Sequence, residues 1–156
     1  MKLFARCLSI LVLGFASTLA LASTPPSTSV VYAMPHCDCC DGYVKYLQQH
    51  GYHVKEAITP HLAALAKQDG VPLKYREQPM GMTTGICHIT RIGGYTVVGH
   101  VPAKVIRRVL SERPHIVGVI LPGMPAGAPG MNGVKTGPLV VYAFDASGKI
   151  WVYAQD

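Results

Sequence analysis

The chain has 156 residues, a length that suits a single domain with one hydrophobic core. Its formal charge of +6 comes from 14 Lys and Arg residues against 8 Asp and Glu residues, with His counted as neutral. The basic residues are scattered, apart from Arg107-Arg108, and no aromatic residues alternate with them, so a nucleic-acid-binding surface is not expected.

The N-terminus has the pattern of a secretory signal peptide. Lys2 and Arg6 precede an apolar run over 8–21, and the tripeptide Ala-Leu-Ala at 20–22 matches a cleavage site. The apolar run is short for a membrane-spanning helix, which needs about 20 residues. We therefore expect export to the periplasm, cleavage that removes Cys7, and no membrane attachment of the mature chain.

The remaining sequence predicts one folded domain. Residues 1–22 are the expected signal peptide, residues 23–29 a flexible polar leader, and residues 30–156 the domain. A helix is expected over 60–68, with Thr59 as its N-cap and Pro60 at its first position. Hydrophobic periodicity and turn residues predict, in chain order, strand 30–33, helix 42–50, strand 53–58, helix 60–68, an irregular segment 71–84, strands 85–91 and 95–99, helix 102–112, strand 116–121, a Gly/Pro-rich loop 122–138, and strands 139–144 and 149–153.

This order is a β-α-β unit followed by a β-β-α unit, which predicts an α/β protein with a thioredoxin-like fold. Such a fold has a central mixed sheet flanked by helices, and here a C-terminal β-hairpin is added to it. In this arrangement a cysteine motif after the first strand lies at the N-terminus of the first helix. The helix dipole and the free N–H groups at that position favour thiolate over thiol.

Three cysteines, Cys37, Cys39 and Cys40, crowd into four positions. Cys37 and Cys40 have the Cys-x-x-Cys spacing of thiol-disulfide enzymes, but Cys39 would make the disulfide pairing ambiguous. Three thiolates on one helical turn make a dense soft-donor site, which suits Cu(I), with Zn(II) and iron–sulfur clusters as competitors. Cys87 is expected to face this cluster, because in a thioredoxin-like fold the start of its strand lies beside the N-terminus of the first helix.

Histidine and methionine residues extend the predicted ligand set. His100 ends the strand that returns to the same edge of the sheet, and His88 adjoins Cys87, although neighbours on a strand point to opposite faces. Met82 precedes Cys87 in a Met-Gly-Met segment, and thioether sulfur is a soft donor, although a single Met more often fills a core gap. The predicted metal ligands are Cys37, Cys39, Cys40, Cys87, His88, His100 and Met82.

Four segments make the sequence resemble the CopG-type periplasmic copper-resistance proteins, a thioredoxin-like metal-binding family with a CxCC motif. They are CDCC at 37–40, CHIT at 87–90, GGYTVVGHVP at 93–102 and PGMPAGAPGM at 122–131. Together with the spacing between them, they cover almost all of the mature chain. One departure is Asp38, where the family commonly has Gly, and it adds a negative charge beside the site.

The resemblance implies a periplasmic protein that binds copper with its four cysteines, as single ions or as a cysteine-bridged cluster. It also implies partners among copper-efflux or copper-oxidising proteins. Redox cycling between Cu(I) and Cu(II), and with it an oxidoreductase activity, is left open by the sequence.

Three other interpretations of the cysteines are weighed against a copper site. A thiol-disulfide oxidoreductase would use Cys37 as the attacking thiolate and Cys40 as the resolving one. A structural zinc site could use all four cysteines, but the adjacent pair Cys39-Cys40 places both sulfurs on one ion with difficulty. Purely structural disulfides are the third interpretation, and adjacent cysteines pair poorly.

Overall fold

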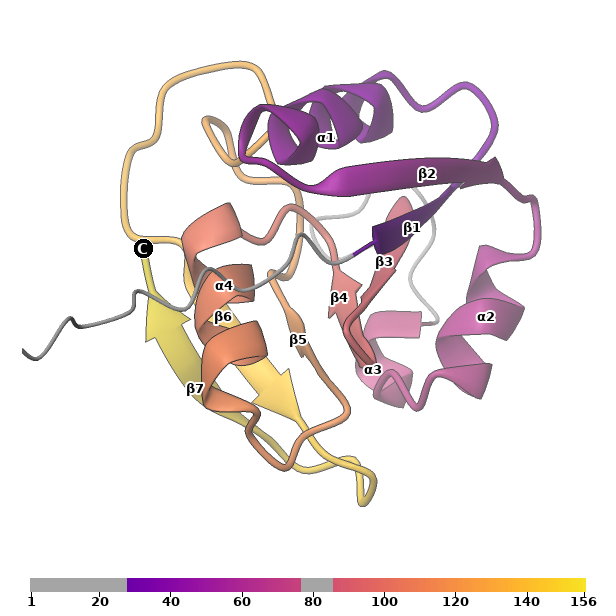
Figure 1. The fold of residues 1–156 in the computed structure, drawn as a ribbon, viewed down its shortest axis with the longest axis vertical. Helices are drawn as coiled ribbons and strands as arrows, with labels where there is room; N and C mark the ends of the chain where they lie inside the picture. Colours follow the sequence, from indigo (N-terminus) through magenta and orange to yellow (C-terminus); the bar gives the residue numbers. More distant parts are fainter. Residues whose placement is uncertain (1–27, 77–85) are drawn as a thin grey trace, which may run out of the picture.

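A mixed β-sheet forms the centre of the protein. The computed structural model describes residues 28–76 and 86–156. Within them, the strands are β1 (Thr28–Ala33), β2 (His53–Ile58), β3 (His88–Ile92), β4 (Tyr95–Val98), β5 (Gly118–Ile120), β6 (Val140–Phe144) and β7 (Ile150–Gln155). They form one seven-stranded sheet in the order β2-β1-β3-β4-β5-β6-β7 (Figure 1). The pairs β1–β2 and β4–β5 are parallel, and the other neighbours are antiparallel.

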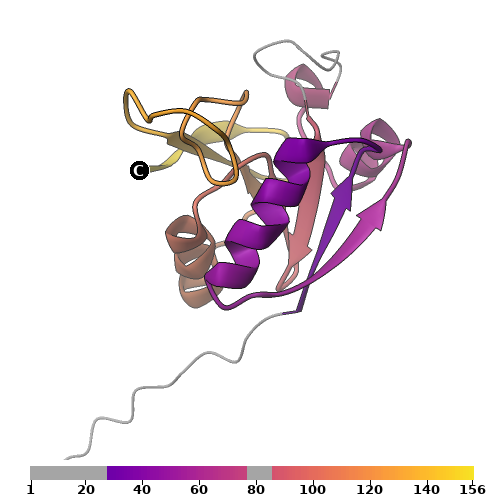
Figure 2. The same cartoon turned by 90° about the horizontal axis from the view of Figure 1, so that it is seen from above.

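Helices cover both faces of this sheet. They are α1 (Asp38–Gln49), α2 (Leu62–Gln68), α3 (Leu73–Arg76) and α4 (Ala103–Glu112). One cluster of buried side chains joins α1 and α4 to the sheet, and another joins α2 and α3 to its opposite face. Figure 2 shows the helices on the two sides of the sheet from above. Val97 and Val119 belong to the first cluster and their neighbours Val98 and Ile120 to the second, because successive strand side chains point to opposite faces.

The element order confirms the predicted α/β class with a central mixed sheet flanked by helices. β1, α1 and β2 form a parallel β-α-β unit, and β3, β4 and α4 form a β-β-α unit, which is the arrangement that the thioredoxin-like prediction requires. β6 and β7 form the predicted C-terminal hairpin. β5 lies parallel to β4 and joins this hairpin to the rest of the sheet.

Several element boundaries differ from those predicted. β1 begins at Thr28 rather than at residue 30. α1 begins at Asp38, four residues before the predicted start, because Asp38 and Asp41 in its first turn suit the positive end of the helix dipole. Cys39 and Cys40 are therefore inside the helix rather than before it.

The start of α2 and the segment after it were also predicted incorrectly. α2 begins at Leu62 with His61 as its N-cap, and Pro60 precedes the helix. Thr59 accepts a hydrogen bond from the backbone N–H of His61 (3.1 Å), so it stabilises the turn before the helix instead of the first helical turn. The short helix α3 lies within the segment that was expected to be irregular.

The Gly/Pro-rich loop between β5 and β6 folds back beside the first turns of α1, as the orange and purple segments show in Figure 2. At their contact a Cβ atom on Gly42 would lie 2.4 Å from the carbonyl oxygen of Gly130. Gly130 has a φ of 75°, in the region that favours glycine. The two glycines thus allow the loop backbone to reach the helix and, as described below, the candidate site. Among residues 28–76 and 86–156, no helix is long and apolar enough to cross a membrane.

Candidate metal centre

The four predicted cysteine ligands come together where β1 ends, α1 begins and β3 begins. Cys37 is the N-cap of α1, and Cys39 and Cys40 lie in its first turn. Cys87 immediately precedes β3, and the antiparallel pairing of β3 with β1 places it beside this turn. A hydrogen bond from the N–H of Met34 to the carbonyl of Cys87 (3.1 Å) continues that pairing. The pairing of β3 with β1 therefore brings Cys87 to the other three cysteines, as the sequence predicted.

The sulfur atoms of these cysteines lie within 4.8 Å of one another. Cys37 and Cys40 are joined by a disulfide, and Cys39 and Cys87 are free thiols. The Cys39 sulfur lies 3.5 Å from that of Cys37 and 3.8 Å from that of Cys87. The Cys40 sulfur lies 3.3 Å from the carbonyl oxygen of Cys87. We call these four residues the sulfur cluster.

The sulfur cluster has a buried side and an accessible side. Cys40 and Cys87 are buried, whereas Cys37 and Cys39 are half-buried. Cys39 also lines a surface hollow of about 520 Å³, together with Asp38, Asp41, Gly42, Lys45, Gly130, Met131 and Asn132. Solvent and small ions can therefore reach the cluster through Cys39, whereas Cys87 lies on the buried side of the cluster.

His100 presents one specific ring nitrogen to the cluster. Its Nδ1 lies 2.7 Å from the carbonyl oxygen of Pro129, and a carbonyl can only accept a hydrogen bond, so Nδ1 carries the proton. In the neutral ring, Nε2 then has a free lone pair, and this atom lies 3.8 Å from the sulfur of Cys87. Burial lowers the pKa of His100 and keeps the ring neutral. This is the state in which histidine binds metals, with its second nitrogen held by a carbonyl.

His88, one of the predicted ligands, also faces the cluster, so the reservation that strand alternation raised against it does not hold. Cys87 lies just before β3, at the end of its pairing with β1, and there its side chain and that of His88 both reach the cluster. Nδ1 of His88 lies 3.4 Å from the sulfur of Cys87, and the ring is fully buried. Burial and, secondarily, the neighbouring His100 lower the pKa of His88 to about 3. Within the described residues, its Nε2 has no hydrogen-bond partner.

Tyr43 forms the wall behind the two histidines. Its ring centroid lies 4.6 Å from that of His88 and 5.4 Å from that of His100, which meets it edge-on. The Tyr43 hydroxyl donates a hydrogen bond to the carbonyl of Val101 (2.8 Å), so this buried polar atom is satisfied. The sequence assigned no role to Tyr43, because a Tyr at helical spacing carries no sign of what it packs against.

Burial raises the pKa of the Cys87 thiol to about 12, with a further contribution from the neighbouring Cys39. Cys87 is consequently a neutral thiol at pH 7 in the absence of a cation. A bound metal ion would reverse this preference, because a coordinated thiol loses its proton. Metal binding at Cys87 should therefore release a proton.

These donors fit a soft metal ion. The site combines the thiol sulfurs of the sulfur cluster with the neutral imidazoles of His88 and His100. Nε2 of His88 is a buried nitrogen without a partner in the described residues. Met124, from the Gly/Pro-rich loop, packs against the sulfur cluster, and its thioether is a soft donor as well. The predicted ligand Met82 lies outside the described residues. Met124 was not among the predicted ligands, although its place in the PGM motif was a usable signal.

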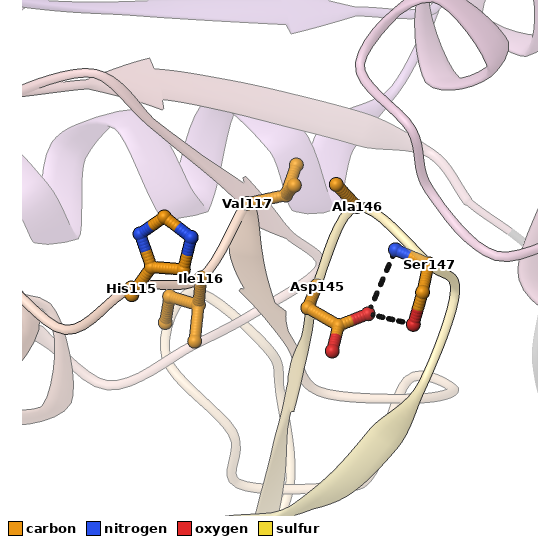
Figure 3. Close-up of a pocket in the computed structure, with 6 residues that line it drawn as sticks. All are labelled: His115, Ile116, Val117, Asp145, Ala146 and Ser147. Carbon is orange, nitrogen blue, oxygen red and sulfur yellow. Dashed lines mark hydrogen bonds between the residues drawn. The ribbon is translucent and has the colours of Figure 1, made fainter.

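A second hollow lies between the end of α4 and the β6–β7 turn, and Figure 3 shows its lining. His115 lies on one side of it and Asp145 on the other. The Asp145 carboxylate already accepts hydrogen bonds from the N–H and the hydroxyl of Ser147, at 2.9 and 2.6 Å, and from the N–H of Lys149. This carboxylate stabilises the hairpin turn, and the hollow lacks the convergent donors of the sulfur cluster.

The fold and the sulfur cluster define the class: an α/β protein that carries a cysteine–histidine cluster at the start of its first helix. Two solved structures, named "Copper resistance protein copG", Form 1 and Form 2, are similar to this chain. Each has 32% sequence identity and a TM-score of 0.71, and the alignment covers 84% of this chain and 98% of the other. The chain therefore belongs to the CopG family of copper resistance proteins, which confirms the resemblance of its motifs.

Residues 84–131 also match the model of a family described as "Protein of unknown function, DUF411". This segment includes Cys87, His88, His100 and Met124. No curated protein matches the chain.

Proposed function

We propose that the chain is a copper-resistance protein that binds Cu(I) at the sulfur cluster. The ligands in this proposal are Cys37, Cys39, Cys40 and Cys87, with His88, His100 and Met82 completing the site. The observation that carries the proposal is the meeting of four cysteine sulfurs within 4.8 Å, one of them from a distant part of the sequence. Soft sulfur donors suit Cu(I), Zn(II) and iron–sulfur clusters, and the relatives of this chain, which are named for copper resistance, favour copper among these.

Full occupation of this site requires the reduced protein. The Cys37–Cys40 disulfide holds two of the four sulfurs, and they become ligands only after reduction. Once reduced, both thiols lie at the N-terminal end of α1, where the helix dipole favours thiolate. Thiolates also bridge metal ions, so the site suits either one ion or a small cluster, and the stoichiometry of binding distinguishes the two.

The proposal includes export. The signal-like residues 1–22 direct the chain to the periplasm, where its partners are copper-efflux or copper-oxidising proteins. The intact mass of the protein recovered from a periplasmic extract tests this step, because cleavage after residue 22 removes residues 1–22, including Cys7.

An anaerobic titration with Cu(I) tests the binding proposal. The reduced protein competes with a chromophoric Cu(I) chelator, and we compare the wild type with Cys39→Ser and Cys87→Ser. Both variants should lose at least about tenfold in affinity, since each removes one soft donor, which corresponds to about 1.4 kcal/mol. His50→Gln, which changes an exposed histidine at the end of α1, is the matched control. Equal affinities in all four proteins would contradict the proposal.

A second candidate function is thiol–disulfide exchange, which the Cys37–Cys40 disulfide at a helix N-terminus favours. In that case Cys37 attacks a substrate disulfide and Cys40 resolves the mixed disulfide. A disulfide-reductase assay separates the two candidates. Full activity of Cys39→Ser, together with unchanged activity after copper loading, would favour the exchange reaction, because copper at the cluster would block Cys37.

A further inference from the structure

We propose that Cys39 and Cys87 form a second disulfide, which makes the sulfur cluster a four-electron reductant of Cu(II). This inference rests on the proposed function in one respect, since it takes copper as the substrate of the cluster. It adds an activity, the reduction of Cu(II) by protein thiols, and it assigns that activity to a pair of residues outside the Cys-x-x-Cys spacing.

The first argument is the arrangement of the four sulfurs. Cys37 and Cys40 are already paired, and the two remaining thiols lie 3.8 Å apart, in direct contact. Besides Cys87, two other cysteines, Cys37 and Cys40, lie close to Cys39. Cys40, its neighbour in sequence, pairs poorly with it, and Cys37 is held in the existing disulfide. Cys87 is therefore the natural partner of Cys39 once the first disulfide has formed.

The second argument is access. Cys87 is 5% exposed, so a bulky external disulfide cannot approach its sulfur. Cys39 lines the hollow beside the carboxylates of Asp38 and Asp41, which outnumber the one ammonium group there, that of Lys45, and attract a cation. A metal ion can consequently reach this thiol pair through Cys39, whereas a bulky disulfide substrate cannot reach Cys87.

The reaction balances with Cu(II) as the oxidant. Two Cu(II) ions each take one electron and become Cu(I). The thiols of Cys39 and Cys87 lose these two electrons and two protons, the S–S bond forms, and the protons pass to solvent. The reduced Cys37–Cys40 pair undergoes the same change with two further Cu(II) ions, so a fully reduced chain delivers four electrons.

The test counts Cu(I) and locates the disulfides. Exported protein without Cys7 is fully reduced, freed of reductant, and mixed anaerobically with excess Cu(II) and a chelator specific for Cu(I). The wild type should produce about four Cu(I) per chain, against none for protein alkylated beforehand. Peptide mapping of the monomer should find Cys39 linked to Cys87. Two Cu(I) per chain, with both of these thiols still open to alkylation, would overturn the proposal.

Two double variants with equal numbers of thiols make the test specific. Cys37→Ser/Cys40→Ser keeps only Cys39 and Cys87 and should still yield about two Cu(I) and a monomeric disulfide. Cys37→Ser/Cys87→Ser keeps the adjacent pair, which closes a disulfide poorly, and should yield few Cu(I) within the monomer. Equal yields would contradict the assignment. Far-UV circular dichroism checks folding, and the wild-type mapping remains decisive if a variant unfolds.

Failure of the second disulfide can be distinguished from failure of Cu(I) binding. The titration described above supplies Cu(I) without an oxidant and therefore measures binding alone. Tight Cu(I) binding with only one disulfide formed under Cu(II) would refute the second disulfide and leave the binding site intact.

Discussion

His100 donates a hydrogen bond from Nδ1 to the carbonyl oxygen of Pro129 across 2.7 Å, and this contact fixes the nitrogen that faces the sulfur cluster. Pro129 belongs to the Gly/Pro-rich loop, whose neighbouring residue Gly130 lies against Gly42 of α1. The loop thus has two roles: it orients a candidate ligand from behind, and it covers the first turns of the helix that carries the cysteines.

Gly42→Ala tests the approach of the loop to α1. In an ordinary helix interior, Gly→Ala stabilises by up to about 1 kcal/mol. Here the added Cβ would meet the Gly130 carbonyl oxygen at 2.4 Å, so we expect a loss of about 1 to 3 kcal/mol in urea unfolding. Gly137→Ala, which meets no atom within 4 Å, is the control and should change little. A stabilised Gly42→Ala would show that the loop does not lie against the helix.

Tyr43→Phe tests the hydrogen bond behind the histidines. The substitution keeps the ring that packs on His88 but leaves the buried carbonyl of Val101 without this donor. We expect a loss of about 1 to 2 kcal/mol in the free energy of unfolding. Tyr153→Phe removes an exposed hydrogen bond to Glu112 and should cost less. Equal costs would indicate that the Tyr43 hydroxyl is not held as described.

Acidification should destabilise the metal-free protein through His88. Burial lowers the pKa of His88 to about 3 in the folded chain, whereas an unfolded chain takes up a proton below about 6.5. Stability is therefore fully retained above pH 6.5 and falls as the pH drops toward 3, by roughly 2 to 3 kcal/mol over the first two units. Urea unfolding at pH 7.5 and 4.5 measures this loss.

His88→Gln should lose less stability than the wild type between these two pH values, because the variant has no proton to gain at position 88. His50→Gln, at the exposed end of α1, should follow the wild type. If all three proteins lose the same amount, His88 is not the group that links folding to pH.

Met124→Leu tests whether the loop contributes a donor. The side chain packs against the sulfur cluster, and leucine keeps its apolar volume while removing the thioether sulfur. We expect a fall in Cu(I) affinity of about threefold to tenfold with little change in stability. Met34→Leu, which alters a methionine packed against the core of α2 and α3 on the opposite face of the sheet, is the control. Unchanged affinity in Met124→Leu would make Met124 a packing residue only.

The sequence predicted the parts of the site that follow from element order. Cys37 and Cys40 had to lie at the start of α1 once the β-α-β unit was recognised, and Cys87 had to join them because β3 pairs with β1. His100 was predicted in the same way, from the return of β4 to that edge of the sheet.

Other features depend on tertiary contacts that no local pattern reveals. The Pro129 carbonyl is a backbone group, so no residue type in the sequence predicts its contact with His100. His88 was predicted as a ligand from its place beside Cys87, although strand alternation argued against it, and the structure shows both side chains in contact at the start of β3. The start of α1 was placed too late because Gly42 resembles a helix boundary, whereas its actual role is to admit the loop.

Copper K-edge X-ray absorption of the reduced, Cu(I)-loaded protein tests the central claim most directly. The four-cysteine site predicts a shell dominated by sulfur, and a multinuclear cluster would add a short copper–copper vector. Cys87→Ser, which changes the cysteine that only tertiary structure brings to the site, should lower the sulfur contribution per copper. A shell of nitrogen and oxygen alone, unchanged in Cys87→Ser, would contradict the claim that the sulfur cluster binds copper.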